Sequence, residues 1–119
     1  MAKEGTTRYY STLQEESVRK LISGHRNPNS GAGMFSKGDV LHEGASMLVE
    51  CKTPTSEKDS FSIKKEWIDK NRKEARDMGM FNQAIAFTYG PGKENFFVVD
   101  EGLFRFLVEK LEEEYSTTD

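Results

Sequence analysis

The sequence predicts an α/β domain in which helices flank a mixed β-sheet, and three observations support this prediction. Amphipathic patterns with helical spacing occur over residues 11–23, 62–78 and 102–115. Two short segments typical of strands lie in each interval between these patterns. The resulting order is α-β-β-α-β-β-α, and a chain of 119 residues suffices for a single domain of this kind with a modest core. Residues 1–11 are expected to be a loose lead-in, and residues 115–119 a polar tail.

The first helix is expected over "STLQEESVRKLIS". Thr12 and Glu15 have the spacing of a capping box, in which two side chains satisfy backbone N–H groups at a helix start. Val18, Leu21 and Ile22 lie on one side of this helix and would face the core. The following segment, "GHRNPNSGAGMFSKG" at 24–38, is a loop longer than an ordinary connection, and such loops in compact domains are usually functional or mobile.

The next two strands are expected to form a hairpin within "DVLHEGASMLVECKT". Gly44-Ala45 suits a two-residue type II′ turn, which favours glycine at its first position. That turn sets a register in which Asp39 lies opposite Glu50. Directly opposed residues share one sheet face, with Cβ atoms roughly 5 Å apart. Two carboxylates so close repel each other unless a cation lies between them or one takes a proton.

The second half of the chain supplies a helix, two strands and a closing helix. The middle helix, "SIKKEWIDKNRKEARDM", has an inward stripe in which Trp67 is a core residue and not a platform for stacking bases. That stripe comprises Ile63, Trp67, Ile68, Ala75 and Met78. "QAIAFTY" and "NFFVVD" are expected to be strands. The closing helix is expected to face the core with Leu103, Phe104, Leu107, Val108 and Leu111.

Composition narrows the functional classes. The chain is 35% hydrophobic and 31% charged, with a formal net charge of −3. Cys51 is its single cysteine, so a disulfide framework is excluded within one chain.

No apolar run approaches the roughly 20 residues that span a membrane. The start lacks the apolar segment of a signal peptide, so a cytoplasmic protein is expected, in the host cytoplasm if the source is a phage. The stretch 109–119 has five acidic residues and one basic residue, which accounts for the net negative charge; residues 1–108 hold 16 basic and 15 acidic residues, which leaves room for a basic, DNA-binding face.

Asp39, Glu50 and Lys52 are therefore predicted to share one face of the hairpin. Carboxylate oxygens are the ligands that a hard cation such as Mg²⁺ prefers, and a neighbouring lysine can orient an attacking water or stabilise charge on a phosphate. A structural salt bridge, in which Lys52 neutralises both acids, explains the same pattern equally well from geometry alone.

The pattern "GDV…MLVECK" resembles the D-(x)n-E-x-K signature of the PD-(D/E)XK nucleases. The resemblance covers roughly residues 12–100: an acid-bearing helix, a Ser-Gly loop, the hairpin, and "SIKKEWIDKNRKEA" followed by "QAIAFTY". This order is similar to that of archaeal-type and phage Holliday junction resolvases. The resemblance implies a restriction-endonuclease-like three-layer sandwich and a metal-dependent endonuclease that acts on branched DNA.

The resemblance also implies roles for individual residues. Asp39, Glu50 and the backbone carbonyl of Cys51 would bind Mg²⁺, with Mn²⁺ as a possible substitute, and Lys52 would serve the attacking water. A glutamate on the first helix would lie near the metal; Glu15 is chosen over Glu16 because it is closer to the inward face of that helix.

Ser30 matches the serine that the resolvases carry in the loop after the first helix, near the scissile phosphate, although a flexible loop of small residues explains it nearly as well. Arg26 at the start of that loop, together with Lys64 and Lys65 at the positive end of the middle helix, are candidates for phosphate contacts.

Paired symmetric cuts on a four-way junction imply a homodimer. Two other functions remain open: a nuclease of the same fold acting on nicked, flapped or linear DNA, and a non-catalytic DNA-binding module in which the acids are structural.

Overall fold

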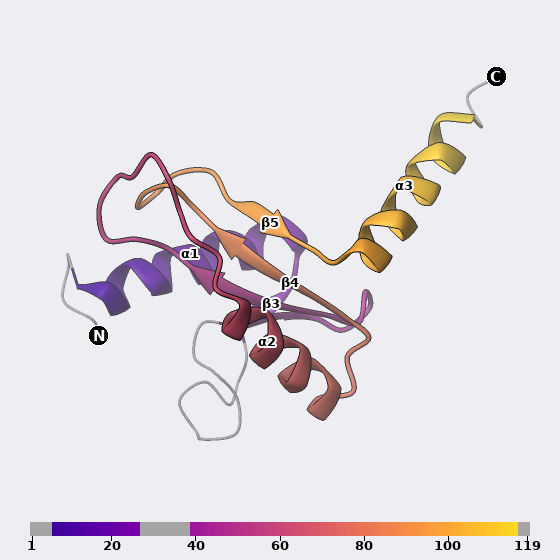
Figure 1. Cartoon of the computed structure of the whole chain (residues 1–119), viewed down its shortest axis with the longest axis horizontal. Coiled ribbons are helices and arrows are strands. Elements are labelled where there is room, and N and C mark those ends of the chain that lie inside the picture. The colour runs from indigo at the N-terminus through magenta and orange to yellow at the C-terminus, as the bar shows by residue number, and fades with distance from the viewer. Residues whose placement is uncertain (1–5, 27–38, 117–119) are drawn as a thin grey trace.

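The computed structural model describes residues 6–26 and 39–116, and these residues form a five-stranded mixed sheet with three helices (Figure 1). The α/β class is therefore confirmed. The elements are α1 (Thr7–Ile22), β1 (His25–Arg26), β2 (Asp39–His42), β3 (Met47–Lys52), α2 (Lys65–Asp77), β4 (Asn82–Phe87), β5 (Phe96–Val98) and α3 (Glu101–Ser116).

The sheet has the order β1-β2-β3-β4-β5. β3 and β4 run parallel, and α2 is the helix of the crossover between them, whereas every other neighbouring pair is antiparallel. A parallel pair needs such a crossover, because a tight turn can join only antiparallel strands.

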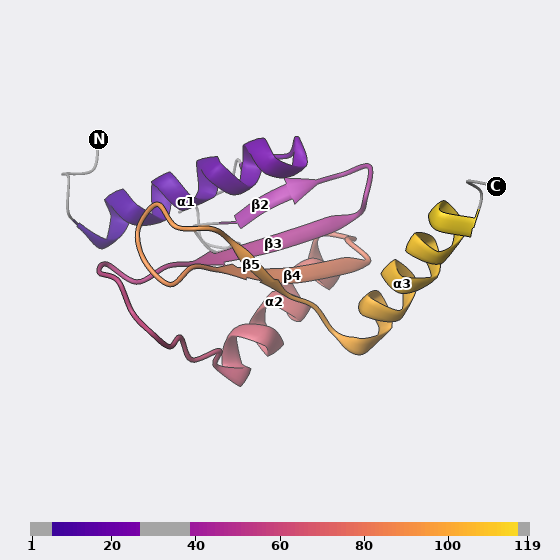
Figure 2. The same cartoon turned by 90° about the horizontal axis from the view of Figure 1, so that it is seen from above.

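Helices α1 and α2 cover opposite faces of this sheet (Figure 2). The separation follows from the alternation of side chains along β3, in which Val49 points toward α1 and Leu48 toward α2. The buried cluster on the α1 face comprises Val18, Val40, Val49, Cys51, Ala84 and Ala86. The buried cluster on the α2 face comprises Leu41, Leu48 and Ala75. Glu50 and Lys52 follow Leu48 at intervals of two residues, so they belong to the α2 face.

The predicted hairpin register is confirmed, since Asp39 pairs with Glu50 and Val40 with Val49. The predicted type II′ turn is wrong. Gly44 does not have a positive φ; Ser46 does, at 51°, and its N–H donates to the carbonyl of Glu43 at 3.0 Å. The chain turns over four residues, 43–46, and Ser46 accepts hydrogen bonds there from the backbone that leads into β4.

The start of α1 also differs from the prediction. The helix begins at Thr7, within the segment expected to be a loose lead-in, and Thr6 is its N-cap: the Thr6 hydroxyl accepts from the N–H of Tyr9 at 3.1 Å. Thr12 and Glu15 therefore lie inside the helix and do not form a capping box. Both threonines are followed by helix-compatible residues, and the pattern alone does not choose between them.

A further strand appears in the segment expected to be a loop. His25 and Arg26 form the edge strand β1, which pairs with Leu41 and Val40 of β2. Two residues are too few for a pattern of alternation, so the sequence gives no strand signal there.

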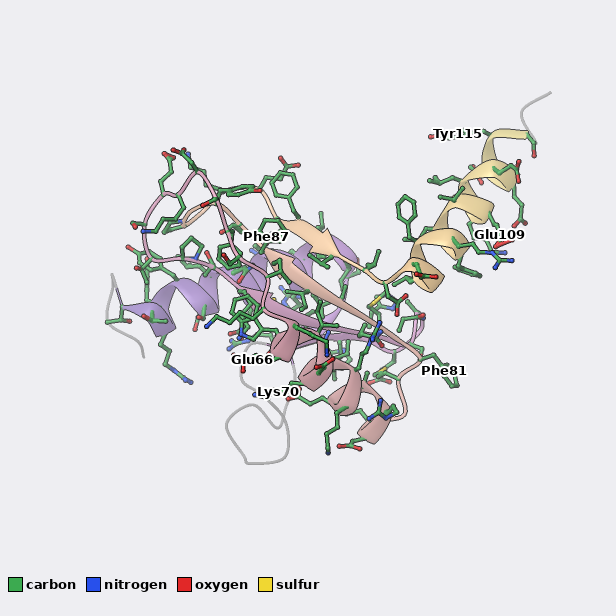
Figure 3. All side chains as sticks on the ribbon, in the orientation of Figure 1. Glu66, Lys70, Phe81, Phe87, Glu109 and Tyr115 are labelled. Atoms are coloured by element: carbon green, nitrogen blue, oxygen red, sulfur yellow. The ribbon has the colours of Figure 1, made fainter. Side chains whose placement is uncertain are left out.

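The prediction that α3 packs against the core is wrong. No residue of α3 is buried, and the helix extends away from the sheet and from both other helices (Figures 1 and 2). Figure 3 shows Glu109 and Tyr115 projecting from α3 at a distance from the body that holds Phe87. The helix ends at Ser116, one residue beyond the predicted helical pattern and within the segment expected to be a polar tail.

Within the described residues, none of the helices combines the length and the apolar character that crossing a membrane requires.

Candidate active site

The candidate site lies where β2 pairs with β3, on the face of the sheet that α2 covers. Glu50 is buried, with 3% of its surface exposed. The Nζ atom of Lys52 is 3.8 Å from Glu50 Oε1, and the Lys52 side chain remains 31% exposed. The backbone of Asp39 lies directly opposite Glu50, although the Asp39 side chain is outside the described part of the structure. The structure thus brings together Glu50, Lys52 and the strand position of Asp39.

Glu50 is held in an electrostatically costly position. Burial raises the pKa of the Glu50 carboxyl, the positive charge of Lys52 opposes that rise, and the nearby Glu74 adds to it. Glu50 Oε2 is buried and has no hydrogen-bond partner among the described residues. A buried carboxylate with an unsatisfied oxygen costs free energy that a cation or a proton would recover.

Glu74 on α2 is an acid near this site that the sequence analysis did not single out. It is 6% exposed, and it lies close enough to Glu50 to raise the pKa of that carboxyl. Lys70 Nζ is 3.9 Å from Glu74 Oε1. The signal that would have found Glu74 is its spacing of seven from Trp67 and its place next to Ala75, both in the inward stripe.

Lys52 is positioned by an aromatic ring as well as by Glu50. Its Nζ atom lies 4.7 Å from the centre of the Trp67 ring, a distance typical of a cation–π contact. Trp67 is half-buried and packs against Phe61, whose ring centre is 6.0 Å away. Trp67 is therefore a packing residue, as expected. Its ring also contacts the candidate catalytic lysine, which was not expected.

Gln14 on α1 holds the C-terminal end of β3 from the sheet face opposite to α2. Its Nε2 atom is within hydrogen-bond distance of the carbonyls of Lys52 and Ala86, at 3.0 and 3.2 Å, and of Asn95 Oδ1 at 3.2 Å. A buried amide that donates to two neighbouring strands holds the backbone of Lys52 in place. The sequence interpretation also missed this residue, although a glutamine one position before Glu15 on the inward side of α1 is a visible signal.

Glu15 is buried, as the facing argument predicted, whereas Glu16 is half-exposed and pairs with Arg19. Glu15 Oε1 accepts hydrogen bonds from Arg26 Nε at 3.0 Å and Nη2 at 2.9 Å. Burial raises the pKa of the Glu15 carboxyl, while Arg26 opposes that rise. Glu15 belongs to α1, and its observed partner is Arg26. Among the described residues, no three His, Cys, Asp or Glu side chains form a group that could hold a metal ion.

The remaining candidates are distributed as follows. Ser30 lies outside the described residues. Cys51 has its side chain in the buried cluster on the α1 face. Arg26 is paired with Glu15 but keeps 41% of its side chain exposed.

The two candidate lysines lie at the start of α2. Lys64 occupies the N-cap position, and its Nζ atom is 5.6 Å from the centre of the Trp67 ring. Lys65 donates to Asp69 at 2.7 Å, and its side chain is 85% exposed. Both lysines thus lie at the positive end of the α2 dipole.

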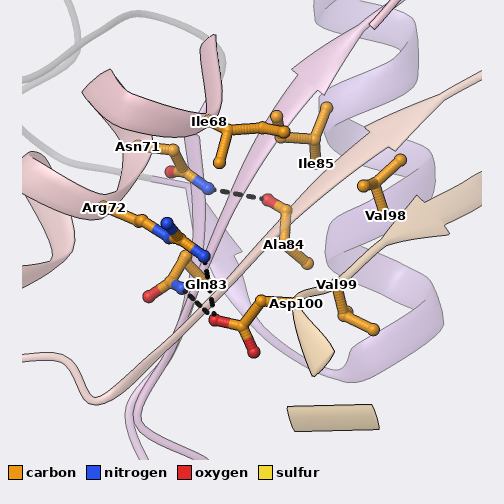
Figure 4. A pocket seen from close by; sticks show the side chains of 9 residues that line it. All are labelled: Ile68, Asn71, Arg72, Gln83, Ala84, Ile85, Val98, Val99 and Asp100. Carbon is orange, nitrogen blue, oxygen red and sulfur yellow. Dashed lines mark hydrogen bonds and ion pairs between the residues drawn. The ribbon is translucent and has the colours of Figure 1, made fainter. Parts of the chain in front are cut away.

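A cavity of about 140 Å³ lies between α2 and the strands β4 and β5 (Figure 4), and neither Glu50 nor Lys52 lines it. Arg72 and Gln83 both contact Asp100 Oδ2 at its edge, at 3.5 and 3.2 Å. Asn71 donates to the carbonyl of Ala84 on another side. The contacts of Asp100 join the residue before α3 to α2 and β4, and none of the predicted site residues lines the cavity.

Comparisons with known proteins identify no relative: a scan against protein-family models found no match, and searches of curated proteins and of solved structures found none either.

Proposed function

We propose that this protein is a metal-dependent DNA endonuclease with the restriction-endonuclease-like fold of the PD-(D/E)XK class. The single observation that carries the proposal is Glu50: a buried carboxylate with an unsatisfied oxygen, beside Lys52 and opposite the strand position of Asp39. An acid pair and a lysine in this register form the D-(x)n-E-x-K pattern on the hairpin where that class carries it.

The donor set suits a hard divalent cation, Mg²⁺ or Mn²⁺. Glu50 would hold it together with Asp39 and the carbonyl of Cys51. Glu15 lies on α1, at the opposite face of the sheet, and its partner there is Arg26. Such a cation, when bound, supplies Lewis acidity at a phosphate oxygen and lowers the pKa of a bound water.

The chain's own residues supply positioning and charge. Lys52 is held between Glu50 and Trp67, and its partly exposed ammonium can donate a hydrogen bond to an attacking water or to a phosphate oxygen. Water would attack the phosphorus in line, and the bond to the leaving oxygen of the sugar would break. Ser30 would contact a non-bridging oxygen of the same phosphate. Lys64, Lys65 and Arg26 would hold neighbouring phosphates.

The substrate proposed is branched DNA, in particular the four-way junction, resolved by paired symmetric cuts. A two-fold homodimer would present two such sites to the two equivalent strands. This part of the proposal depends on the resemblance of the element order to the junction resolvases, and the substrate comparison below tests it separately.

The test is cleavage by the variant Glu50→Gln, which keeps the shape of the side chain and removes its charge. We expect cleavage of DNA in the presence of Mg²⁺ to fall by about 100-fold or more, since a lost charge-stabilising group in an active site typically costs 10²–10³ in rate, while binding to DNA persists. Glu16→Gln, which alters a half-exposed acid on α1, is the matched control and should cleave normally. Full activity of purified Glu50→Gln would contradict the proposal.

Two further measurements complete this test. Mg²⁺ should raise the thermal unfolding midpoint of the wild type and have less effect on Glu50→Gln, because a ligand that binds only the folded state stabilises it. A panel of four-way junction, flap, nicked and linear duplex DNA identifies the substrate, with paired symmetric cuts expected on the junction.

A second function is favoured by the contact between Lys52 and Glu50, which is also the geometry of a structural ion pair. In that case the protein would bind DNA without cutting it. DNA binding with no Mg²⁺-dependent cleavage by the wild type, and unchanged binding by Lys52→Met, would establish this alternative.

A further inference from the structure

Helix α3 carries an apolar stripe that the described residues of the body leave exposed. Five residues at helical spacing form the stripe, and their exposed fractions run from 42% at Leu107 to 72% at Tyr115. The stripe consists of Phe104, Leu107, Val108, Leu111 and Tyr115. Spacings of three, four, seven and eleven residues place all five on one side of an α-helix. An apolar stripe of this kind normally faces another surface of protein.

The direction of α3 is fixed by contacts at its first turn. Asp100 Oδ1 accepts from the N–H of Leu103 at 2.9 Å, and the carbonyl of Asp100 accepts from the N–H of Phe104 at 3.0 Å. The other carboxylate oxygen of Asp100 contacts Arg72 and Gln83 on the body (Figure 4). The helix is therefore attached by its capping residue to α2 and β4, and it presents the stripe outward.

The solvent-exposed apolar area of this stripe is large for a chain of this size. Counting about 150–250 Å² for a whole aromatic side chain and about 60–120 Å² for a whole aliphatic one, the exposed fractions leave roughly 300–500 Å² on the stripe. This is comparable to the largest apolar patch on a typical monomer, roughly 300–600 Å², which often marks an interaction site. Two such stripes packed together would bury about 600–1,000 Å², and the stems of flanking charged residues would bring the total near the roughly 1,000 Å² of a specific interface.

We propose that the occupant of this stripe is a second copy of the chain, with the two α3 helices packed antiparallel about a two-fold axis. Phe104 and Leu111, and likewise Val108 and Tyr115, are seven residues apart, which is the repeat that lets side chains of two helices interdigitate. In such a symmetric dimer the stripe of each copy is buried against the same stripe of the other copy.

The charges of α3 select the antiparallel arrangement. Its C-terminal half carries three consecutive glutamates, 112–114, whereas Arg105 lies near the N-terminus. Parallel packing would place the two glutamate clusters side by side. Antiparallel packing places each cluster near Arg105 of the other copy and near the positive end of the other helix dipole.

This inference deepens the two-fold homodimer of the proposed function by assigning its contact surface; no residue of the stripe belongs to the Glu50 site, so the tests of the dimer and of cleavage can fail separately. The first test is sedimentation equilibrium across a range of protein concentrations. We expect a reversible dimer, and we expect the double variant Leu107→Glu/Leu111→Glu to raise its dissociation constant by about 30-fold or more, the effect of losing a binding hot spot. Phe81→Ser, at an 88% exposed residue outside α3, should leave the dimer unchanged.

The second test identifies the surfaces in contact. Cys51 is buried and is the single cysteine of the chain, so an added cysteine reports on its own position. Val108→Cys should form a disulfide-linked dimer under mild oxidation, whereas Glu113→Cys, on the opposite side of α3, should not. A wild type that stays monomeric at every concentration, a dimer unaffected by the stripe substitutions, or cross-linking at residue 113 in preference to 108 would each overturn the proposal.

Discussion

At the scale of single residues, the burial of Glu50 sets a pH dependence. Its folded-state pKa is raised above the unfolded value of 4.5, mainly because of burial. The folded protein therefore holds this proton more tightly than the unfolded chain does. The contribution of Glu50 to stability is most favourable below pH 4.5 and is lost as the pH rises through the raised pKa.

The variant Glu50→Gln should accordingly gain stability relative to the wild type as the pH rises from acidic to neutral. The gain at neutral pH should be about 1–3 kcal/mol, the usual cost of leaving a buried polar group unsatisfied. Urea unfolding at several pH values in the presence of a chelator measures it. Glu16→Gln should behave in the opposite way, because the hydrogen bond from Arg19 lowers the pKa of Glu16. An equal pH dependence in wild type and Glu50→Gln would show that Glu50 is not the strained group.

Trp67 is expected to position Lys52 for catalysis. Removing the ring while keeping an apolar side chain, in Trp67→Leu, should lower the single-turnover cleavage rate by about 10-fold, because a cation–π contact worth roughly 1 kcal/mol or more no longer holds the ammonium. Trp67→Phe should retain most of the rate, and DNA affinity should change little in either variant. Equal rates for Trp67→Leu and the wild type would reduce Trp67 to a packing residue.

At the scale of the elements, α1 is joined to the end of β3 through one amide. Gln14 Nε2 donates toward the oxygens of Lys52, Ala86 and Asn95. The substitution Gln14→Glu would replace this N–H donor with a carboxylate oxygen, which can only accept. That oxygen would then lie next to three other oxygens that also only accept. We expect Gln14→Glu to destabilise the protein by about 3 kcal/mol at neutral pH, and Gln14→Leu by only about 1 kcal/mol. Thermal unfolding should show the difference shrinking in acid, where the introduced carboxyl regains a proton to donate. Greater damage from leucine than from glutamate would contradict the role of Gln14 as a donor.

The hairpin and the two faces of the sheet were predictable because they depend on the two-residue period of strands. Once a short turn is placed between Asp39 and Glu50, the alternation fixes which residues share a face, and an error in the turn type leaves the register unchanged. Burial of Glu15 was predictable for a similar reason, since helical spacing places it beside the inward side of Val18.

Other features were not predictable, because they depend on what lies next to an element. The stripe of α3 is plain in the sequence, but periodicity does not say which surface covers it. Glu74 has the spacing of an ordinary helix ion pair with Lys70, and only the packing of α2 on the sheet brings it near Glu50. Strand β1 is too short for any period to be visible.

At the scale of the whole molecule, the DNA-binding face is predicted to include the N-terminal end of α2. The Nζ atoms of Lys52 and Lys64 lie 4.7 and 5.6 Å from the centre of the Trp67 ring, so the candidate catalytic lysine and a candidate phosphate contact are both close to one side chain. The exposed ammonium of Lys65 extends that surface.

Each phosphate contact releases counterions when DNA binds, so its loss makes the dependence of log affinity on log salt concentration shallower by about one unit. We expect this change in Lys64→Ala and in Lys65→Ala. Arg26→Ala should also reduce the slope, and it should destabilise the fold, since it removes the ion pair of the buried Glu15. Lys73→Ala is the control, because Lys73 pairs with Asp77 at the far end of α2. Affinities measured by fluorescence anisotropy at several salt concentrations give the slopes. Wild-type slopes in both lysine variants at the start of α2, with a reduced slope in Lys73→Ala, would move the DNA to the C-terminal end of this helix and away from Lys52.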